Sequence, residues 1–92
     1  MIFTALTNAQ RAPRAFKEWT RLSFQVRGGA TITIAKEQGE SQNPNDGIQL
    51  TQASTNPPYE TWWKGELWYA SNVAGSQFVM LIIGTADSGM HP

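Results

Sequence analysis

Apolar and polar residues alternate with a period of two along residues 16–26, which is typical of a β-strand with one buried face. A second alternating segment spans residues 30–34. Between the two lies Gly28-Gly29, a pair that tolerates positive φ and is typical of a two-residue hairpin turn. The pattern therefore predicts an antiparallel hairpin. Its inward side chains are Leu22, Phe24, Val26, Ala30, Ile32 and Ile34.

Turn-forming residues recur about every 8–12 residues along the rest of the chain, and no helical period is present. Polar, turn-rich stretches at 37–47 and 53–58 are predicted loops, and Lys64-Gly65 predicts a second tight turn. The alternation predicts an all-β protein, a small antiparallel β-sandwich or barrel of six to seven short strands. The further predicted strands are 48–51, 59–63, 66–70 and 77–83.

The domain organisation follows from where the alternation begins and ends. Residues 1–15 are irregular and predict an extended N-terminal arm, with a short strand over residues 2–6. Residues 16–84 form the predicted β-sandwich domain. Residues 85–92 have no pattern and predict a flexible tail.

The last predicted strand is apolar at every position from Phe78 to Ile83. A strand with one solvated face alternates, so a run that is apolar on both faces needs cover on both faces. A chain of 92 residues buries only about 60–65% of the surface that its unfolded form exposes. The run therefore predicts that the domain completes its burial by associating with another molecule, including further copies of itself.

The net charge is zero, but the two parts of the chain differ in sign. The charged side chains of residues 1–36 sum to +5, and those of residues 37–92 sum to −5. One interpretation is that a basic segment of one copy meets an acidic surface of another copy or of a host protein. The other is that the two halves interleave in one small sheet, where their charges mix.

Three of the four tryptophans, Trp62, Trp63 and Trp68, lie beside one predicted turn, together with Tyr59 and Tyr69. Adjacent residues of a strand point to opposite faces, so Trp62 and Trp63 cannot both fill the core. Three interpretations remain open: core packing, anchoring of a protein interface, or stacking on sugar rings. In the last, the hydrogen-bonding candidates are Asn56, Glu60 and Asn72.

Few residues could support catalysis or hold a cofactor. The chain has no cysteine, and its single histidine, His91, lies in the predicted tail. Glu60 and Glu66 flank a turn, where solubilising charges are common. Residues 43–47 lack the ligand spacing of an EF-hand. We therefore predict no enzyme activity, no cofactor and no metal site.

Nucleic acids and membranes are also poor candidate partners. Basic and aromatic residues interleave over residues 14–21, but a pI near 6.5 and a zero net charge do not provide the sustained basic field that phosphate binding needs. The longest apolar run, residues 78–83, is far shorter than the roughly 20 residues of a spanning helix.

The order of these segments resembles that of small β-rich accessory virion proteins of tailed bacteriophages. The resemblance covers about residues 20–84: the strand 21–26, the glycine turn, the strand 30–34, the segments 47–50 and 65–71, and the terminal apolar strand. Paired tryptophans are not part of that pattern. The resemblance implies a head or tail accessory protein, such as a capsid cement (decoration) protein or a small tail or fibre component.

The sequence and the resemblance together predict a non-enzymatic capsid decoration protein. It would be made in the host cytoplasm, oligomerise on the capsid surface of the virion and bridge subunits of the major capsid protein. The alternatives are a small tail or fibre component, or a carbohydrate-binding module that recognises host surface glycans through Tyr59, Trp62 and Trp63. The predicted interface residues are Arg11, Arg14, Trp62, Trp63, Trp68, Val79, Leu81 and Ile83.

Overall fold

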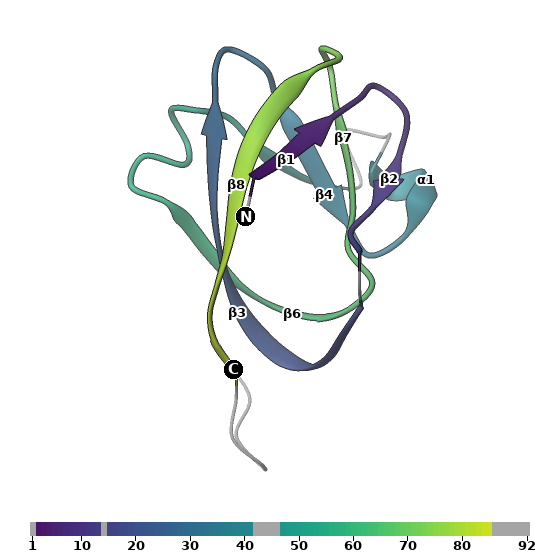
Figure 1. The fold of residues 1–92 in the computed structure, drawn as a ribbon, viewed down its shortest axis with the longest axis vertical. Coiled ribbons are helices and arrows are strands. Elements are labelled where there is room, and N and C mark those ends of the chain that lie inside the picture. Colours follow the sequence, from purple (N-terminus) through teal and green to yellow (C-terminus); the bar gives the residue numbers. More distant parts are fainter. Residues whose placement is uncertain (1, 14, 42–46, 86–92) are drawn as a thin grey trace.

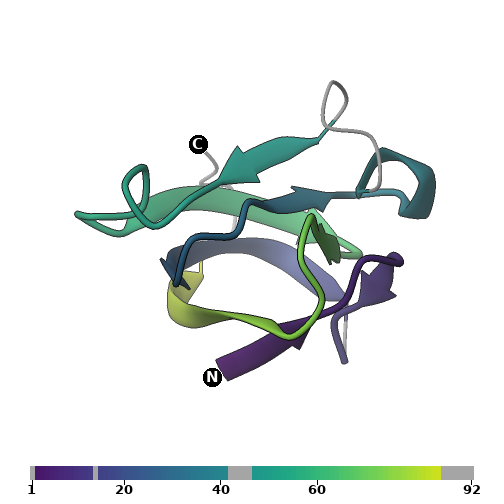
Figure 2. The same ribbon diagram turned by 90° about the horizontal axis from the view of Figure 1, so that it is seen from above.

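A computed structural model of the protein describes residues 2–13, 15–41 and 47–85. These residues form two antiparallel four-stranded sheets that pack face to face (Figures 1 and 2), so the predicted small all-β sandwich is confirmed. The elements are β1 Ile2–Ala5, β2 Gln10–Arg11, β3 Phe16–Arg27, β4 Ile32–Ala35, α1 Gln38–Ser41, β5 Ile48–Leu50, β6 Tyr59–Gly65, β7 Trp68–Ser71 and β8 Ser76–Thr85. The strand order is β1-β8-β3-β6 in the first sheet, sheet A, and β2-β7-β4-β5 in the second, sheet B.

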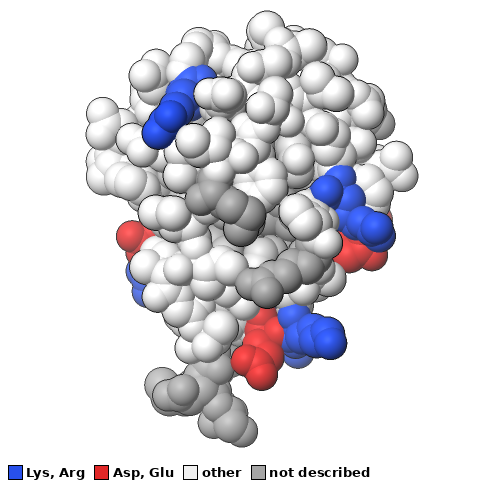
Figure 3. Space-filling view, viewed as in Figure 1, with Lys and Arg blue, Asp and Glu red and all other residues white. Residues whose placement is uncertain are grey.

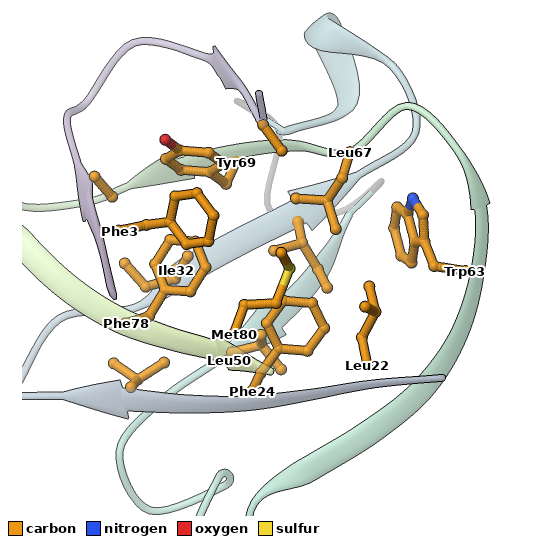
Figure 4. Close-up of a cluster of buried hydrophobic side chains, with 14 of the residues drawn as sticks. Phe3, Leu22, Phe24, Ile32, Leu50, Trp63, Leu67, Tyr69, Phe78 and Met80 are labelled. Atoms are coloured by element: carbon orange, nitrogen blue, oxygen red, sulfur yellow. The ribbon is translucent and has the colours of Figure 1, made fainter. Parts of the chain in front are cut away.

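One hydrophobic core fills the space between the sheets (Figure 4). The long strand β3 has the predicted alternation, and its inward residues Leu22, Phe24 and Val26 are at most 1% exposed. Sheet B contributes Ile32 and Ile34, which are fully buried on the opposite side. The period-two pattern therefore identified the core face of both strands correctly.

Aromatic rings join the two sheets at one end of this core. The ring of Phe78 on β8 lies 5.2 Å from that of Phe3 on β1 and 5.1 Å from that of Tyr69 on β7, measured between ring centroids. The ring of Phe24, on β3, lies 6.3 Å from the ring of Phe78. Tyr69 belongs to sheet B and the three phenylalanines to sheet A, so this cluster stabilises the contact between the layers.

The hairpin predicted around Gly28-Gly29 is wrong. The strand before the glycines, β3, lies in sheet A, whereas β4 lies in sheet B, so the chain crosses between the layers here. Gly28 has a φ of 89°, which fits the prediction of a residue with positive φ. A second crossing follows Gly65, whose φ is 99°, between β6 and β7. Alternation shows which face of a strand is buried, but strands that face each other across a core have the same pattern as strands that pair.

The predicted N-terminal arm is instead part of the sandwich over its described residues. β1 pairs with β8 and β2 pairs with β7, and Phe3, Ala5 and Ala12 are buried in the core cluster. The short strand predicted over residues 2–6 is confirmed as β1, whereas β2, with two residues, is too short to show a period-two pattern. Thr85 ends β8, and the remainder of the predicted tail lies outside the described residues.

Two further differences concern sheet B. The predicted loop over 37–47 contains a short helical turn, α1, which packs against β4 and β7. In the same region Thr33, Ala35 and Ala70 are buried, although Thr33 and Ala35 alternate with the core-facing residues of β4. The strand that is covered on both faces within one chain is therefore β4.

The described ion pairs join the basic and acidic parts of the chain. The Arg21 guanidinium lies 2.7 Å from the Glu60 carboxylate, because β3 pairs with β6. The Arg11 guanidinium lies 3.7 Å from the Glu66 carboxylate, near the pairing of β2 with β7. Both pairs are largely solvent-exposed, and such pairs contribute about 0–1 kcal/mol each. The interleaving interpretation of the charge distribution thus accounts for these four residues.

The buried hydroxyl of Thr55 bonds to the backbone near the end of β3. Thr55 is fully buried, and its Oγ1 accepts a hydrogen bond of 2.9 Å from the Val26 amide and donates one of 2.7 Å to the Thr51 carbonyl. Thr55→Val is expected to lower the free energy of unfolding by about 1–3 kcal/mol, because valine keeps the volume but leaves the Val26 amide without an acceptor. Urea unfolding measures the loss. Thr55→Ser keeps the hydroxyl and should lose less; an equal loss in both variants would contradict this role.

The phenol of Tyr69 makes the stability depend on alkaline pH. Burial raises the pKa of Tyr69 above its ordinary value of 10.0. The unfolded chain then loses the phenolic proton at a lower pH than the folded chain, so this contribution is complete below pH 10 and is lost as the pH rises through the folded pKa. We expect the free energy of unfolding to fall more steeply above about pH 10 in the wild type than in Tyr69→Phe. Urea unfolding at a series of pH values measures both slopes, and identical slopes would contradict the prediction.

Candidate interaction surface

The apolar run of β8 is only partly covered within one protomer. Phe78 and Met80 are at most 2% exposed, but Leu81, Ile82 and Ile83 are 53%, 40% and 51% exposed. Both faces of this run were predicted to need cover. Among the described residues, the second half of the strand lacks that cover. Figure 1 shows why: the end of β8 runs on past β1 toward the C-terminus.

The pairing of β8 changes along its length. β1 pairs with the first part of the strand only, from Ser76 to Val79, whereas β3 pairs with it as far as Thr85. Leu22 lies opposite Ile82 and Arg21 opposite Gly84, so Ile83 is the extra residue of a β-bulge. Beyond Val79, no described residue pairs with the outer edge of β8. A free sheet edge and three exposed aliphatic side chains thus coincide.

Trp62 and Trp63 point to opposite faces of β6, as predicted. Trp63 is 3% exposed, and its indole Nε1–H donates a hydrogen bond of 2.8 Å to the Glu66 carbonyl. The Lys36 ammonium lies 5.9 Å from the centre of the same indole. Trp63 is therefore a core residue with a satisfied donor, and its assignment to an interface or a sugar platform is wrong for the folded protomer.

Trp62 lies half-buried on the outer face of sheet A. The Arg21 guanidinium lies 5.8 Å from the centre of its indole, in a cation–π arrangement. The same guanidinium donates two hydrogen bonds, of 3.0 and 2.7 Å, to the Glu60 carboxylate. The indole is thereby held beside a planar ion pair, a combination that can contact a protein or a sugar.

Trp68 and Arg11 form a similar but separate pair on sheet B. The Arg11 guanidinium lies 6.0 Å from the centre of the Trp68 indole and is paired with Glu66. Because β2 is an edge strand of the other layer, this pair does not share a face with the residues of β8.

The predicted interface residues do not share one surface: β8 carries Val79, Leu81 and Ile83, β6 carries Trp62, sheet B carries Arg11 and Trp68, and the core contains Trp63. Val79 and Leu81 lie on the outer face of sheet A, where they alternate with the core-facing Phe78 and Met80. Trp62 lies on the same face two strands away, about 10 Å across the sheet, and it is aligned with Gly84 rather than with Leu81. Arg14 lies outside the described residues.

Two exposed apolar residues of this surface were not among the named interface residues. Ile2 is 56% exposed and lies opposite Val79 on the neighbouring strand β1. Ile82 lies inside the apolar run that was predicted to need cover, but it was not among the named interface residues. The free end of β8 exposes it, and a period-two pattern carries no signal for that. We call Leu81, Ile82 and Ile83 together the β8 apolar edge.

Charge is scarce around this edge. Neither β1 nor β8 contains a charged residue. Figure 3 views the molecule from the side on which these strands lie and shows a largely uncharged surface, with one separate basic side chain at the upper left and acidic and basic side chains side by side lower down. An open depression of about 520 Å³ adjoins the end of β8. It is lined by Ala15, Phe16, Lys17, Glu18, Thr20 and Thr85.

The residues considered for catalysis and metal binding do not gather at one place in the described part of the chain. Within the described residues, no three or more His, Cys, Asp or Glu side chains gather in a way that could hold a metal ion. Glu60 and Glu66 are each paired with a different arginine. His91 and residues 43–46 lie outside the described part of the chain. No described helix is long and apolar enough to cross a membrane.

Comparison with protein-family models, with curated proteins and with solved structures finds no match to this chain. The class of the protein therefore comes from its own fold. It is a small all-β sandwich protein in which, within the described ranges, the apolar end of β8 stays exposed.

Proposed function

We propose that this chain is a non-enzymatic structural protein of a tailed bacteriophage, a capsid decoration protein that bridges subunits of the major capsid protein. The observation that carries the proposal is the β8 apolar edge, three adjacent aliphatic side chains that are each 40–53% exposed. Contiguous exposed aliphatic surface marks sites of protein association. The resemblance of residues 20–84 to small virion proteins supplies the kind of partner.

The mechanism is the addition of buried contacts between neighbouring shell subunits. The β8 apolar edge supplies non-polar area, which is worth about 25 cal/mol for each Å² removed from water. Trp62 with its Arg21–Glu60 ion pair supplies an aromatic anchor on the same face. Cross-bridged subunits then resist the outward pressure of packaged DNA.

The test is to locate the subunit on intact particles and to measure its attachment. Purified wild-type protein should bind shells that lack it, and Leu81→Glu should lose that binding because a carboxylate would be buried against apolar surface. Val73→Glu is a matched control, since Val73 is 56% exposed in the loop at the opposite end of β8. Absence of the protein from virions, or unchanged attachment of Leu81→Glu, would refute the proposal. Density on the tail would instead identify a tail or fibre component.

One arrangement favours the carbohydrate-binding alternative. Trp62 offers part of an indole face beside the hydrogen-bonding Arg21–Glu60 pair, as sugar-binding sites do. Of the three aromatic residues predicted for this site, Trp63 is buried and Tyr59 packs against the core cluster, so Trp62 alone remains. Binding to a glycan array that disappears in Trp62→Ala, with capsid attachment intact, would establish this function instead.

A further inference from the structure

The backbone groups at the end of β8 have a defined orientation. The Val26 amide points away from β8, toward Thr55. Amides alternate along a strand, so those of Gln25 and Ser23 point toward β8, where their opposite residues are Val79 and Leu81. The N–H and C=O groups of Val79 and Leu81 therefore face β3, and those of Ile82 face the free edge.

The register of β1 agrees with this assignment. The Gly75 amide donates a hydrogen bond of 2.9 Å to the Ala5 carbonyl, so Ala5 presents its carbonyl to the edge of β8. Ala5 lies opposite Ser76, and Phe3 lies opposite Phe78. The even-numbered residues of β8 thus face β1 where β1 is present. No described strand lies beside Ile82 to bond to its outward N–H and C=O groups.

Of the devices that usually prevent strand pairing, this edge has only a β-bulge among the described residues. Edge strands are commonly protected by charged residues, by proline or by a covering segment. From Ser76 to Thr85, β8 contains no charged residue and no proline. The bulge at Ile83 adds local twist, which limits pairing to a short stretch. An uncharged strand can pair with an identical strand without like-charge repulsion.

We propose that the β8 edges of two copies of this chain pair antiparallel, joining their A sheets across a two-fold axis near Ile82. In this register Ile82 lies opposite Ile82 of the second copy, and their outward-facing N–H and C=O groups bond to each other. Leu81 then lies opposite Ile83 of the second copy, so aliphatic side chains from both protomers cover one another. A two-fold axis requires only one self-complementary patch.

A second copy fits this edge for three reasons: the strand is neutral, its exposed side chains are all aliphatic, and both copies present the same unpaired groups. The contact is small, because it involves one strand end and three exposed side chains from each copy. Stable interfaces bury about 1,200–2,000 Å² in total. Pairing at this edge should therefore give a reversible dimer whose population rises with concentration. The inference concerns the free protein and does not depend on the proposed function; a dimer that uses this edge would dissociate before the edge contacts a capsid.

The decisive experiment is sedimentation velocity of the full chain, with variants at one position. The wild type should shift from monomer toward dimer between about 10 µM and 1 mM, the range in which small interfaces dissociate. Ile82→Pro removes the outward N–H without removing a bond to β3, and it should weaken dimerisation at least tenfold relative to Ile82→Ala. Circular dichroism checks that both variants fold. Because the chain has no cysteine, Ile82→Cys can also be tested for a disulfide-linked dimer under mild oxidation, with Val73→Cys as the matched control.

Leu81→Glu keeps the test decisive if Ile82→Pro does not fold. It should also abolish the dimer, whereas Val73→Glu should leave it unchanged. A wild type that remains monomeric throughout the range would overturn the proposal, as would equal dimerisation of Leu81→Glu and the wild type. A dimer that forms only after residues 86–92 are deleted would also overturn it, because the chain's own end would then occupy the edge.

Discussion

Phe78→Ala is expected to lower the free energy of unfolding by about 3–5 kcal/mol. The side chain is fully buried, and its ring is in contact with Phe3, Phe24 and Tyr69. Alanine would remove contacts to both sheets at once and leave a cavity that three rigid rings cannot refill. A domain of this size has about 5–14 kcal/mol of stability in total, so the variant should be close to unfolding at physiological temperature.

Thermal and urea denaturation followed by circular dichroism measure this loss. Ile83→Ala is a control in the same strand, because a side chain that is 51% exposed should contribute far less. Phe78→Leu keeps most of the apolar volume and should lie between the two. If Phe78→Ala and Ile83→Ala were equally destabilising, the core would not be centred on this aromatic cluster.

Trp63→Ala and Trp62→Ala are expected to behave oppositely, although the two residues are adjacent. Trp63→Ala should cost about 3–5 kcal/mol, because it removes a buried indole and leaves the Glu66 carbonyl without its donor. Trp62→Ala should cost about 1 kcal/mol or less, because that indole is half-buried on the outer face beside Arg21. Any binding function of the pair should be lost selectively in Trp62→Ala, with the fold intact.

Urea unfolding of the two variants side by side gives the comparison. Trp63→Phe retains an aromatic ring but has no N–H, so it should fall between Trp63→Ala and the wild type. A Trp62→Ala variant that unfolds as readily as Trp63→Ala would show that the two faces of β6 are not distinguished as the structure indicates. These variants also separate a loss of binding from a loss of folding in the tests of function.

The strand β8 shows how a correct observation led to an incomplete prediction. The uninterrupted apolar run was visible in the sequence, and a chain this short was expected to leave part of it uncovered. Which residues are exposed depends on the two neighbouring strands. The pairing with β1 stops at Val79, whereas the pairing with β3 continues to Thr85. Ile82, which was not among the named interface residues, is 40% exposed and lies past the last residue that pairs with β1.

The N-terminal segment shows the opposite case. The short strand predicted over residues 2–6 exists as β1, but its exposed positions include the apolar Ile2, so the sequence did not show that Phe3 and Ala5 are the buried residues. Their burial depends on the neighbouring strand β8, about 75 residues later in the sequence, with which they pair residue by residue. The same long-range pairing brings Arg21 to Glu60 and converts a lopsided charge distribution into local ion pairs.

The residue pattern predicted the all-β class, the inward faces of β3 and β4, and the opposite orientations of Trp62 and Trp63. It also predicted that the apolar run 78–83 would not be fully covered. These depend on the two-residue period of a strand, which is a local property of the backbone. Which strands pair, which turns cross between layers, and which part of β8 stays uncovered depend on contacts between residues far apart in the sequence. A glycine turn such as Gly28-Gly29 joins two strands equally well within a sheet or between sheets, and the choice is made by the burial of both apolar faces against each other.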